Sequence, residues 1–229
     1  QMNPKAGLTF ANAMKAFLRA DPDIIMVGEM RDKDTTSIGI EASLTGHLVF
    51  ATLHTNSAPE SIIRLLDMGM DPFNFADALL GILAQRLAKR LCKCKEAYTP
   101  SQEEVKHFIT EYCGELVNTP EFKADLNGSY KKVFDRFQKD YGFGKPEYKM
   151  YKAKGCDICS GTGYKGRAGL HEMLVGTDTV KKQIQEHARV AEILATALSE
   201  GMLTLKMDGM EKVLQGVTDM AQVRAVCIK

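Results

Sequence analysis

The sequence has no excess of charge of one sign, no long apolar run and no repeat or low-complexity tract. Its 30 Lys and Arg nearly balance 29 Asp and Glu, giving a net charge of +1. This balance gives no electrostatic reason to expect nucleic acid or a membrane surface as a partner. Apolar runs such as 48–53 are far shorter than the roughly 20 residues that cross a bilayer. No signal peptide opens the chain, which favours a cytoplasmic protein.

The phosphate-binding motif G-x-x-x-x-G-K-[ST] is also absent. Proteins that carry this motif surround phosphates with its backbone N–H groups and its lysine. Patterned sequence begins directly at Gln1, and we interpret the chain as a piece of a longer protein.

A buried amphipathic helix is predicted over 9–20, where apolar residues recur at helical spacing. Its apolar face consists of Phe10, Met14, Phe17 and Leu18.

Two mainly apolar runs, 24–27 and 48–53, predict strands that are covered on both faces. Between them a helix is expected to start at Asp32 or Asp34 and to end before Thr45. Ser57-Ala58-Pro59-Glu60 has the pattern of a capping box with proline in the first turn, so it predicts a third helix. Strands that alternate with helices indicate an α/β fold with a mostly parallel sheet.

A fourth helix is predicted over 79–91 from leucines at helical spacing (Leu79, Leu80, Leu83, Leu87 and Leu91). The segment 95–149 mixes charged and aromatic residues and is interpreted as an inserted, mainly helical surface segment. Beyond the glycine-rich turns of 155–169, helices are expected to the C-terminus, with stops at Gly201 and Gly209. We therefore divide the chain into 1–91, a cysteine-rich region at 92–170 and a helical subdomain at 171–229.

A carboxylate and an imidazole follow the two predicted strands. Glu29 comes directly after 24–27 and Gly28, and His54 comes after 48–53. Ligands of open parallel sheets bind outside the carboxyl ends of the strands. A glutamate at that edge can orient water for attack on a phosphate, and a histidine can contact the phosphate. A surface glutamate and a structural histidine are the alternatives.

Several segments together closely resemble the ATPases of type II secretion and type IV pilus assembly. They are 1–11, 19–32, 44–56, 64–70, 83–87 and 163–172. The resemblance covers most of the chain apart from roughly 95–150. It implies the C-terminal part of a RecA-like P-loop core, ATP as the nucleotide that is hydrolysed, Mg²⁺ as cofactor, and a hexameric motor. It further implies an inner-membrane platform protein as partner and a cytoplasmic position at the inner membrane.

The resemblance also assigns roles to individual residues. Glu29 corresponds to the catalytic carboxylate of the Walker B motif, and Gly28 stands where other P-loop enzymes have an aspartate that is directed at magnesium. His47 and His54 fall in the family's histidine box, and His54 is the better candidate for sensing the terminal phosphate. Arg86 lies in a family motif as a nucleotide-binding, structural or subunit-contact residue. The phosphate-binding loop is placed upstream of Gln1, so this stretch alone is expected to hydrolyse ATP poorly or not at all.

Four of six cysteines form two close pairs, Cys92-Lys93-Cys94 and Cys156-Asp157-Ile158-Cys159. C-x-x-C lets two thiolates reach one tetrahedral zinc, and many members of the resembled family bind structural zinc with two such pairs. Here the first pair has one intervening residue, so its bite is less favourable, and Cys113 is an alternative ligand. Reduced free thiols are the alternative to a structural Zn²⁺ site.

Two other functions stay open at this stage. One is a zinc-stabilised protein-interaction module without hydrolysis of its own, and the other is a retraction or DNA-uptake motor of the same superfamily. A basic stretch predicts either a solvated helix face or a contact with acidic loops of a partner. It consists of Arg86, Lys89, Arg90, Lys93 and Lys95.

Overall fold

The computed structural model describes residues 9–227, apart from the side chains of Phe10 and Ala11. The part of the family resemblance in 1–8 and the predicted burial of Phe10 therefore lie outside the described residues. The chain forms two compact units, which are described separately. Unit 1 comprises the residues up to Ile82 together with Leu174–Leu194, and unit 2 comprises Leu83–Met173 together with the residues from Ala195. These borders differ from the three-part division predicted from sequence, because the chain returns to unit 1 after Met173.

Unit 1 contains a parallel pair of strands, β1 (Ile24–Val27) and β2 (Leu48–Ala51), as predicted. Helix α2 (Lys33–Leu44) connects them, and it begins after Asp32, whose carboxylate accepts a hydrogen bond from the Thr35 N–H at 2.8 Å. Capping of this kind satisfies backbone donors that have no partner within the helix. Helix α2 returns the chain to the edge of the sheet at which β1 begins, so β2 runs parallel to β1, as in βαβ units.

One face of β1 packs against helices, and the other does not. The covered side belongs to a cluster with α1 (Phe10–Leu18) and α2 that contains Met14, Ile25, Val27, Ile38 and Ala42. On the opposite face Ile24 and Met26 are 60% and 80% exposed. The prediction of two covered faces is therefore wrong for the described structure, and Phe17, predicted to be buried, is exposed.

The remaining helices of unit 1 are α3 (Ala58–Asp67), α4 (Pro72–Ala78) and α8 (Asp178–Gln185), and α4 contacts both α2 and α8. The hydroxyl of Ser57 caps α3 by accepting from the Glu60 N–H, as the sequence predicts.

The predicted helix over 79–91 is wrong, because α4 ends at Ala78 and β3 (Gly81–Leu91) follows as a strand. Leucines four residues apart lie on one side of a helix, but four is also a multiple of the two-residue strand period. Leu83 and Leu87 accordingly lie on one exposed side of β3. The basic stretch that starts at Arg86 is thus on a strand and the turn after it.

In unit 2, β3 pairs with β6 (Tyr164–Val175), and the Cys92 N–H donates to Gly163 O at 2.9 Å beyond the end of β3. Helix α9 (Val190–Ser199), whose residues up to Leu194 belong to unit 1, ends before Gly201, which adopts φ 100°. Gly209 is no helix stop, because it lies inside α10 (Leu205–Leu214). A Cβ there would meet the Val223 side chain of α11 (Met220–Val226) at 2.8 Å, so the glycine permits close helix packing.

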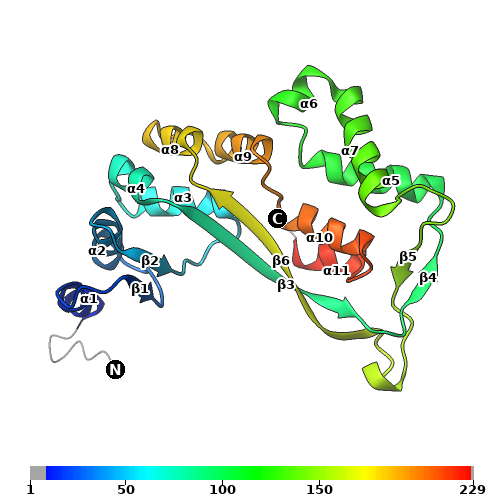
Figure 1. Ribbon diagram of the computed structural model, residues 1–229, viewed down its shortest axis with the longest axis horizontal. Coiled ribbons are helices and arrows are strands. Elements are labelled where there is room, and N and C mark those ends of the chain that lie inside the picture. Colours follow the sequence, from blue (N-terminus) through cyan, green and yellow to red (C-terminus); the bar gives the residue numbers. More distant parts are fainter. Residues whose placement is uncertain (1–8, 228–229) are drawn as a thin grey trace. The chain divides into compact units, whose positions relative to one another are not determined.

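The inserted segment leaves and returns through an antiparallel pair, β4 (Glu96–Tyr98) and β5 (Met150–Lys152) (Figure 1). It carries α5 (Gln102–Gly114), α6 (Pro120–Ala124) and α7 (Leu126–Tyr141), so its predicted helical character is confirmed. Its centre is aromatic, with edge-on contacts among fully buried Tyr112, Phe137 and Phe143.

Two carboxylates attach the inserted segment to the C-terminal helices. Glu211 of α10 accepts hydrogen bonds from Tyr112 Oη, Arg136 Nη2 and Tyr141 Oη at 2.8–2.9 Å. Glu111 of α5 binds Arg224 of α11 and also Lys206 of α10. The segment is therefore anchored to the rest of unit 2 at both ends of its sequence and along its helices.

Candidate functional site

The carboxyl ends of β1 and β2 stay together beyond the last paired residues. The Met30 N–H donates to Thr52 O at 3.1 Å, and the Thr52 hydroxyl donates to Gly28 O. Because these bonds flank Glu29 on one strand and precede His54 on the other, they hold both residues at the same edge of the sheet.

Glu29 and His54 are in direct contact, as the ends of the strands predict. His54 Nε2 lies 2.6 Å from Glu29 Oε1, and Arg31 Nε lies 2.5 Å from Glu29 Oε2. The Glu29 side chain is 21% exposed, whereas the His54 side chain is 82% exposed. The carboxylate is thus the recessed member of the group, and the imidazole forms its solvent-facing side.

The surroundings of Glu29 keep it ionised. The hydrogen bond from Arg31 lowers the pKa of Glu29; partial burial opposes this, and the charges of Arg31 and His54 add to the lowering. Glu29 Oε1 is shielded from solvent, and among the described residues no donor meets hydrogen-bond geometry toward it. His54 Nε2, at 2.6 Å, covers this oxygen, so a water molecule can take it as an acceptor once the imidazole moves away.

The loop that carries His54 is fixed to the first two turns of α3. Thr55 Oγ1 and Ser61 Oγ share a hydrogen bond of 2.6 Å, and the Asn56 N–H donates to Glu60 Oε2 at 3.2 Å. These bonds make the position of His54 depend on the packing of α3 and not on the loop alone.

A cavity of about 360 Å³ opens at this group. This volume is at the lower end of the range for small-molecule sites. The cavity is lined by Glu29, Met30, Arg31, Leu53, His54 and Arg64. Arg64 was not singled out from the sequence, because nothing in its α3 pattern shows which side of the helix meets the strand ends.

The two other predicted nucleotide-binding residues are not among the described residues that line this cavity. His47 precedes β2, at the end of the strand opposite to His54, and its Nδ1 lies 3.0 Å from Ala42 O at the end of α2. Arg86 lies on β3 in unit 2, with Nη1 3.5 Å from Gln85 O. The structure therefore brings together Glu29 and His54 of the four predicted residues.

The second predicted site is in unit 2, where four sulfur atoms lie within 4.8 Å of one another. They belong to Cys92, Cys94, Cys156 and Cys159. Cys92 follows β3 directly, and a turn closed by the Lys95 N–H and Cys92 O brings Cys94 back. The predicted helix at Leu91 is not what presents the C-x-C pair, because Leu91 ends a strand.

The sulfur spacing fits a tetrahedral metal. Zinc–sulfur bonds of about 2.3 Å at tetrahedral angles place sulfur atoms about 3.8 Å apart. The Cys92–Cys156 and Cys94–Cys159 sulfur distances are both 3.9 Å, and the Cys156–Cys159 distance is 3.7 Å. The cluster can thus hold a metal ion with four thiolates. Cys113 is buried in α5 and is not part of it.

The N–H groups around Cys159 favour its thiolate form. Burial opposes ionisation, but hydrogen bonds from the Cys156 and Gly163 N–H groups lower the pKa of Cys159 to about 6. The corresponding N–H to sulfur distances are 3.1 and 3.2 Å. Thiolate is the form that binds metal.

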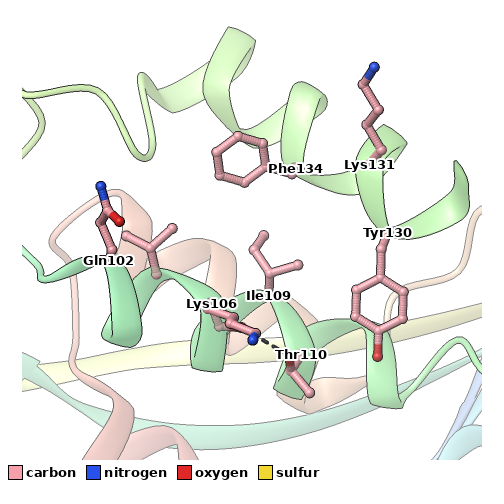
Figure 2. Close-up of a pocket in the computed structure, with 8 residues that line it drawn as sticks. Gln102, Lys106, Ile109, Thr110, Tyr130, Lys131 and Phe134 are labelled. Atoms are coloured by element: carbon pink, nitrogen blue, oxygen red, sulfur yellow. Dashed lines mark hydrogen bonds between the residues drawn. The ribbon is translucent and has the colours of Figure 1, made fainter. Parts of the chain in front are cut away.

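A further hollow of about 440 Å³ lies between α5 and α7 (Figure 2). Its eight lining residues include the apolar side chains of Val105, Ile109 and Phe134 and the cations Lys106 and Lys131, but no carboxylate, histidine or cysteine. It therefore lacks the groups for hydrolysis, and the Glu29 cavity is the candidate catalytic site. Within 9–227, no helix is both long and apolar enough to span a bilayer.

Comparison with known sequences identifies relatives over the whole chain. The family model described as type II/IV secretion system protein matches residues 1–225. The type IV pilus assembly ATPase PilB of Thermus thermophilus is 44% identical over 230 residues, covering 100% of this chain and 22% of that protein. The type II secretion system ATPase E of Vibrio cholerae is 39% identical, covering 99% of this chain and 39% of that protein. The chain thus spans well under half the length of these relatives.

Solved structures show the same fold. The pilus retraction motor PilT, with bound ADP, aligns with a TM-score of 0.58 and 22% identity over 96% of this chain and 44% of that chain. The ATPase DotB of Legionella pneumophila aligns with a TM-score of 0.54 and 19% identity over 95% of this chain and 42% of that chain. The chain therefore has the α/β fold found in these ATPases.

Proposed function

Since the chain belongs to the type II/IV secretion system protein family, we propose that it is the part of an ATP-hydrolysing motor that supplies the catalytic carboxylate. The observation that carries this proposal is the contact of Glu29 with His54 at the joined ends of two parallel strands. A surface glutamate without a catalytic role would need neither this recessed position nor a neighbouring cation that keeps it ionised.

In the proposed mechanism, His54 moves away from Glu29 Oε1, and Glu29 then orients a water molecule through this oxygen. Glu29 takes a proton from this water as the bond from oxygen to the terminal phosphorus forms and the bond to the ADP oxygen breaks. Arg31 holds Glu29 ionised and in place. His54 contacts the terminal phosphate from the solvent-facing side, and loss of that phosphate frees it to move.

The remaining parts of the ATP site are not supplied by this chain's motifs. The phosphates need backbone N–H groups and a lysine of the kind that G-x-x-x-x-G-K-[ST] provides. Mg²⁺ neutralises phosphate charge when it is bound. Gly28 offers no side-chain ligand for it, although nothing lies within 4 Å of a Cβ at that position. We therefore propose an upstream phosphate-binding loop as the complement of Glu29.

The experiment is an ATPase assay of the protein expressed from its complete gene. Glu29→Gln keeps the size of the side chain and removes the proton acceptor, so we expect Mg²⁺-dependent turnover to fall about 100-fold or more. Glu186→Gln is the matched control, because Glu186 is 61% exposed in the same unit, where it pairs with Lys182, and does not line the cavity. Unchanged turnover in Glu29→Gln would remove Glu29 from the mechanism.

Pilus assembly or secretion is favoured over retraction as the task of this motor. The relatives that are 38–44% identical carry the names of pilus assembly or type II secretion ATPases, whereas the retraction motor shares 22% identity and shows the fold alone. The cysteine cluster also favours these classes by family resemblance. We further propose a hexamer that works in the cytoplasm on an inner-membrane platform protein, as the family resemblance implies.

The cysteine cluster is proposed to hold one structural Zn²⁺. Its four sulfurs fit the spacing of a tetrahedral site, and no fifth ligand or open position is needed. The cluster joins the end of β3 to the turn before β6, at the base of the inserted segment. A zinc-stabilised interaction module without hydrolysis remains the competing proposal, and full ATPase activity of the complete protein would contradict it.

A further inference from the structure

The hollow between α5 and α7 in the inserted segment has an apolar interior that is open to solvent. Ile109 of α5 and Phe134 of α7 lie on opposite sides of it (Figure 2), and Val105 and Tyr130 also line it. The other lining residues are polar and exposed: Gln102, Lys106, Thr110 and Lys131. A ligand can therefore reach the apolar residues without a rearrangement of the helices.

The two aromatic residues of the hollow are held in place by contacts outside it. The ring of Tyr130 packs edge-on against Phe122, with 5.9 Å between the ring centroids, and Phe134 packs against Phe143 at 6.4 Å. A Cβ on Gly144 would come within 2.9 Å of Phe134 Cζ, so this ring lies close against the backbone there. Movement of either ring into the hollow would break these contacts, so the hollow does not close by itself.

Each of the two helices contributes a lysine to the hollow, and neither lysine is paired. Lys106 of α5 and Lys131 of α7 line it, whereas no carboxylate does. In the part of the chain that the structure describes, neither ammonium group forms an ion pair or a hydrogen bond. The neighbouring Lys132, in contrast, binds Glu121 at 2.7 Å. Positive charge beside apolar surface complements a ligand that carries both carboxylates and apolar side chains.

The dimensions of the hollow suit a short peptide segment. Its lining extends along α5 from Gln102 to Thr110, which is about 12 Å at a rise of 1.5 Å per residue. Amphipathic helices dock their apolar faces into hydrophobic grooves, with anchoring side chains three or four residues apart. Two such side chains are separated by about 5–6 Å and can both lie within this length.

We propose that the hollow between α5 and α7 is a docking site for an acidic amphipathic segment of a partner protein. The apolar side chains of this segment enter between Ile109 and Phe134, and its carboxylates pair with Lys106 and Lys131. The proposal does not depend on catalysis by Glu29, because the hollow lies within unit 2 and shares no lining residue with the Glu29 cavity.

The test is a selection from a phage-displayed library of random peptides, about three helical turns long, on the protein expressed from its complete gene. The library is first depleted on Thr110→Trp, because Thr110 is exposed and an indole at this position fills the hollow. We expect the enriched peptides to combine Asp or Glu with Leu, Ile, Phe or Met. Enrichment of peptides without acidic residues would overturn the inference. No enrichment would also overturn it, as expected if another part of the same protein or a second copy covers the hollow.

Fluorescence anisotropy of the most enriched peptide then measures the contribution of the lysines. The double variant Lys106→Gln/Lys131→Gln is expected to bind about 10-fold more weakly, as for the loss of two exposed ion pairs. Added salt should weaken binding to wild type more than to this variant, because salt screens exposed charges. If Thr110→Trp does not fold, the library is depleted on this double variant instead.

The matched control is Lys123→Gln/Lys139→Gln, because both lysines are exposed in the same segment and do not line the hollow. We expect this control to bind the peptide as tightly as wild type. Equal weakening by the two double variants would show an unspecific attraction of charge, and no weakening by either would show that the lysines are not used. Both results would contradict the inference.

Discussion

The attachment of the inserted segment to the C-terminal helices through Glu111 can be tested by removing one charge. The Glu111 side chain is 14% exposed and lies 2.5 Å from Arg224 Nη2 and 3.1 Å from Lys206 Nζ. Hydrogen bonding to Arg224, opposed by burial and aided by Lys206, lowers the pKa of Glu111 to about 2. We expect Glu111→Gln to loosen α5 from α10 and α11 and to lower the free energy of unfolding.

The magnitude follows from the shift in pKa. A fall from 4.5 to about 2 corresponds to about 3.4 kcal/mol at 1.36 kcal/mol per unit. Arg224 is 50% exposed, and solvent screens such a pair. We therefore expect Glu111→Gln to cost about 1–2 kcal/mol at pH 7.

The stabilisation by Glu111 should depend on pH in a characteristic way. The folded-state pKa lies below the unfolded one, so the stabilisation is complete above about pH 4.5 and is lost as the pH falls toward 2. The difference in unfolding free energy between wild type and Glu111→Gln should accordingly shrink between pH 5 and pH 3. Near-ultraviolet circular dichroism during urea unfolding reports on the buried Tyr112 beside Glu111.

The control for this charge is Glu121→Gln. Glu121 binds Lys132 at 2.7 Å in the same segment, but the two side chains are 61% and 73% exposed. Such surface pairs contribute about 0–1 kcal/mol. The assignment of Glu111 as an anchor would be refuted if both substitutions lowered the free energy of unfolding equally. It would also be refuted if the difference between wild type and Glu111→Gln did not shrink at acidic pH.

Two further outcomes are expected. Freshly purified protein should contain about one zinc per chain. Cys156→Ser and Cys159→Ser should lose both the zinc and thermal stability, whereas Cys113→Ser should keep them. Elemental analysis that finds no metal in the wild-type protein would contradict the site. In the complete protein, Arg31→Gln should raise the pKa of Glu29 and so move the acid limb of the ATPase pH profile to higher pH, whereas an unmoved limb would show that Arg31 does not tune the carboxylate.

Local signals in the sequence were sufficient for the part of the fold that builds the catalytic edge. Asp32 and Ser57 cap their helices as predicted, because capping depends on residues three or four positions apart. The contact of Glu29 with His54 followed from one further rule, that parallel strands end at the same edge. Sequence reasoning reached this site because each step involved neighbouring elements.

Features that depend on distant segments were missed. The leucines of 79–91 satisfy helix and strand periods alike, and only pairing with β6, more than seventy residues later, selects the strand. Glycine often ends helices, but Gly209 lies inside α10, where the Val223 side chain leaves no room for a Cβ. No residue pattern near Arg64 in the sequence indicates that its side chain lines the cavity. In each case the deciding partner is remote in sequence.

The two units differ in how far their charged side chains are paired within the unit. In unit 2 the recessed carboxylates Glu111 and Glu211 each bind at least two donors, so they stabilise the fold and leave no charge for a ligand. In unit 1 Glu29 keeps an oxygen without a well-aligned donor, and the Arg64 guanidinium lines the same cavity without an ion pair in the described structure. Glu29 is paired with Arg31 at 2.5 Å, so the exposed Arg64 is the charge at this cavity for which the described residues show no ion pair. This difference supports the proposal that unit 1 carries the catalytic carboxylate, whereas the ion pairs of Glu111 and Glu211 stabilise unit 2.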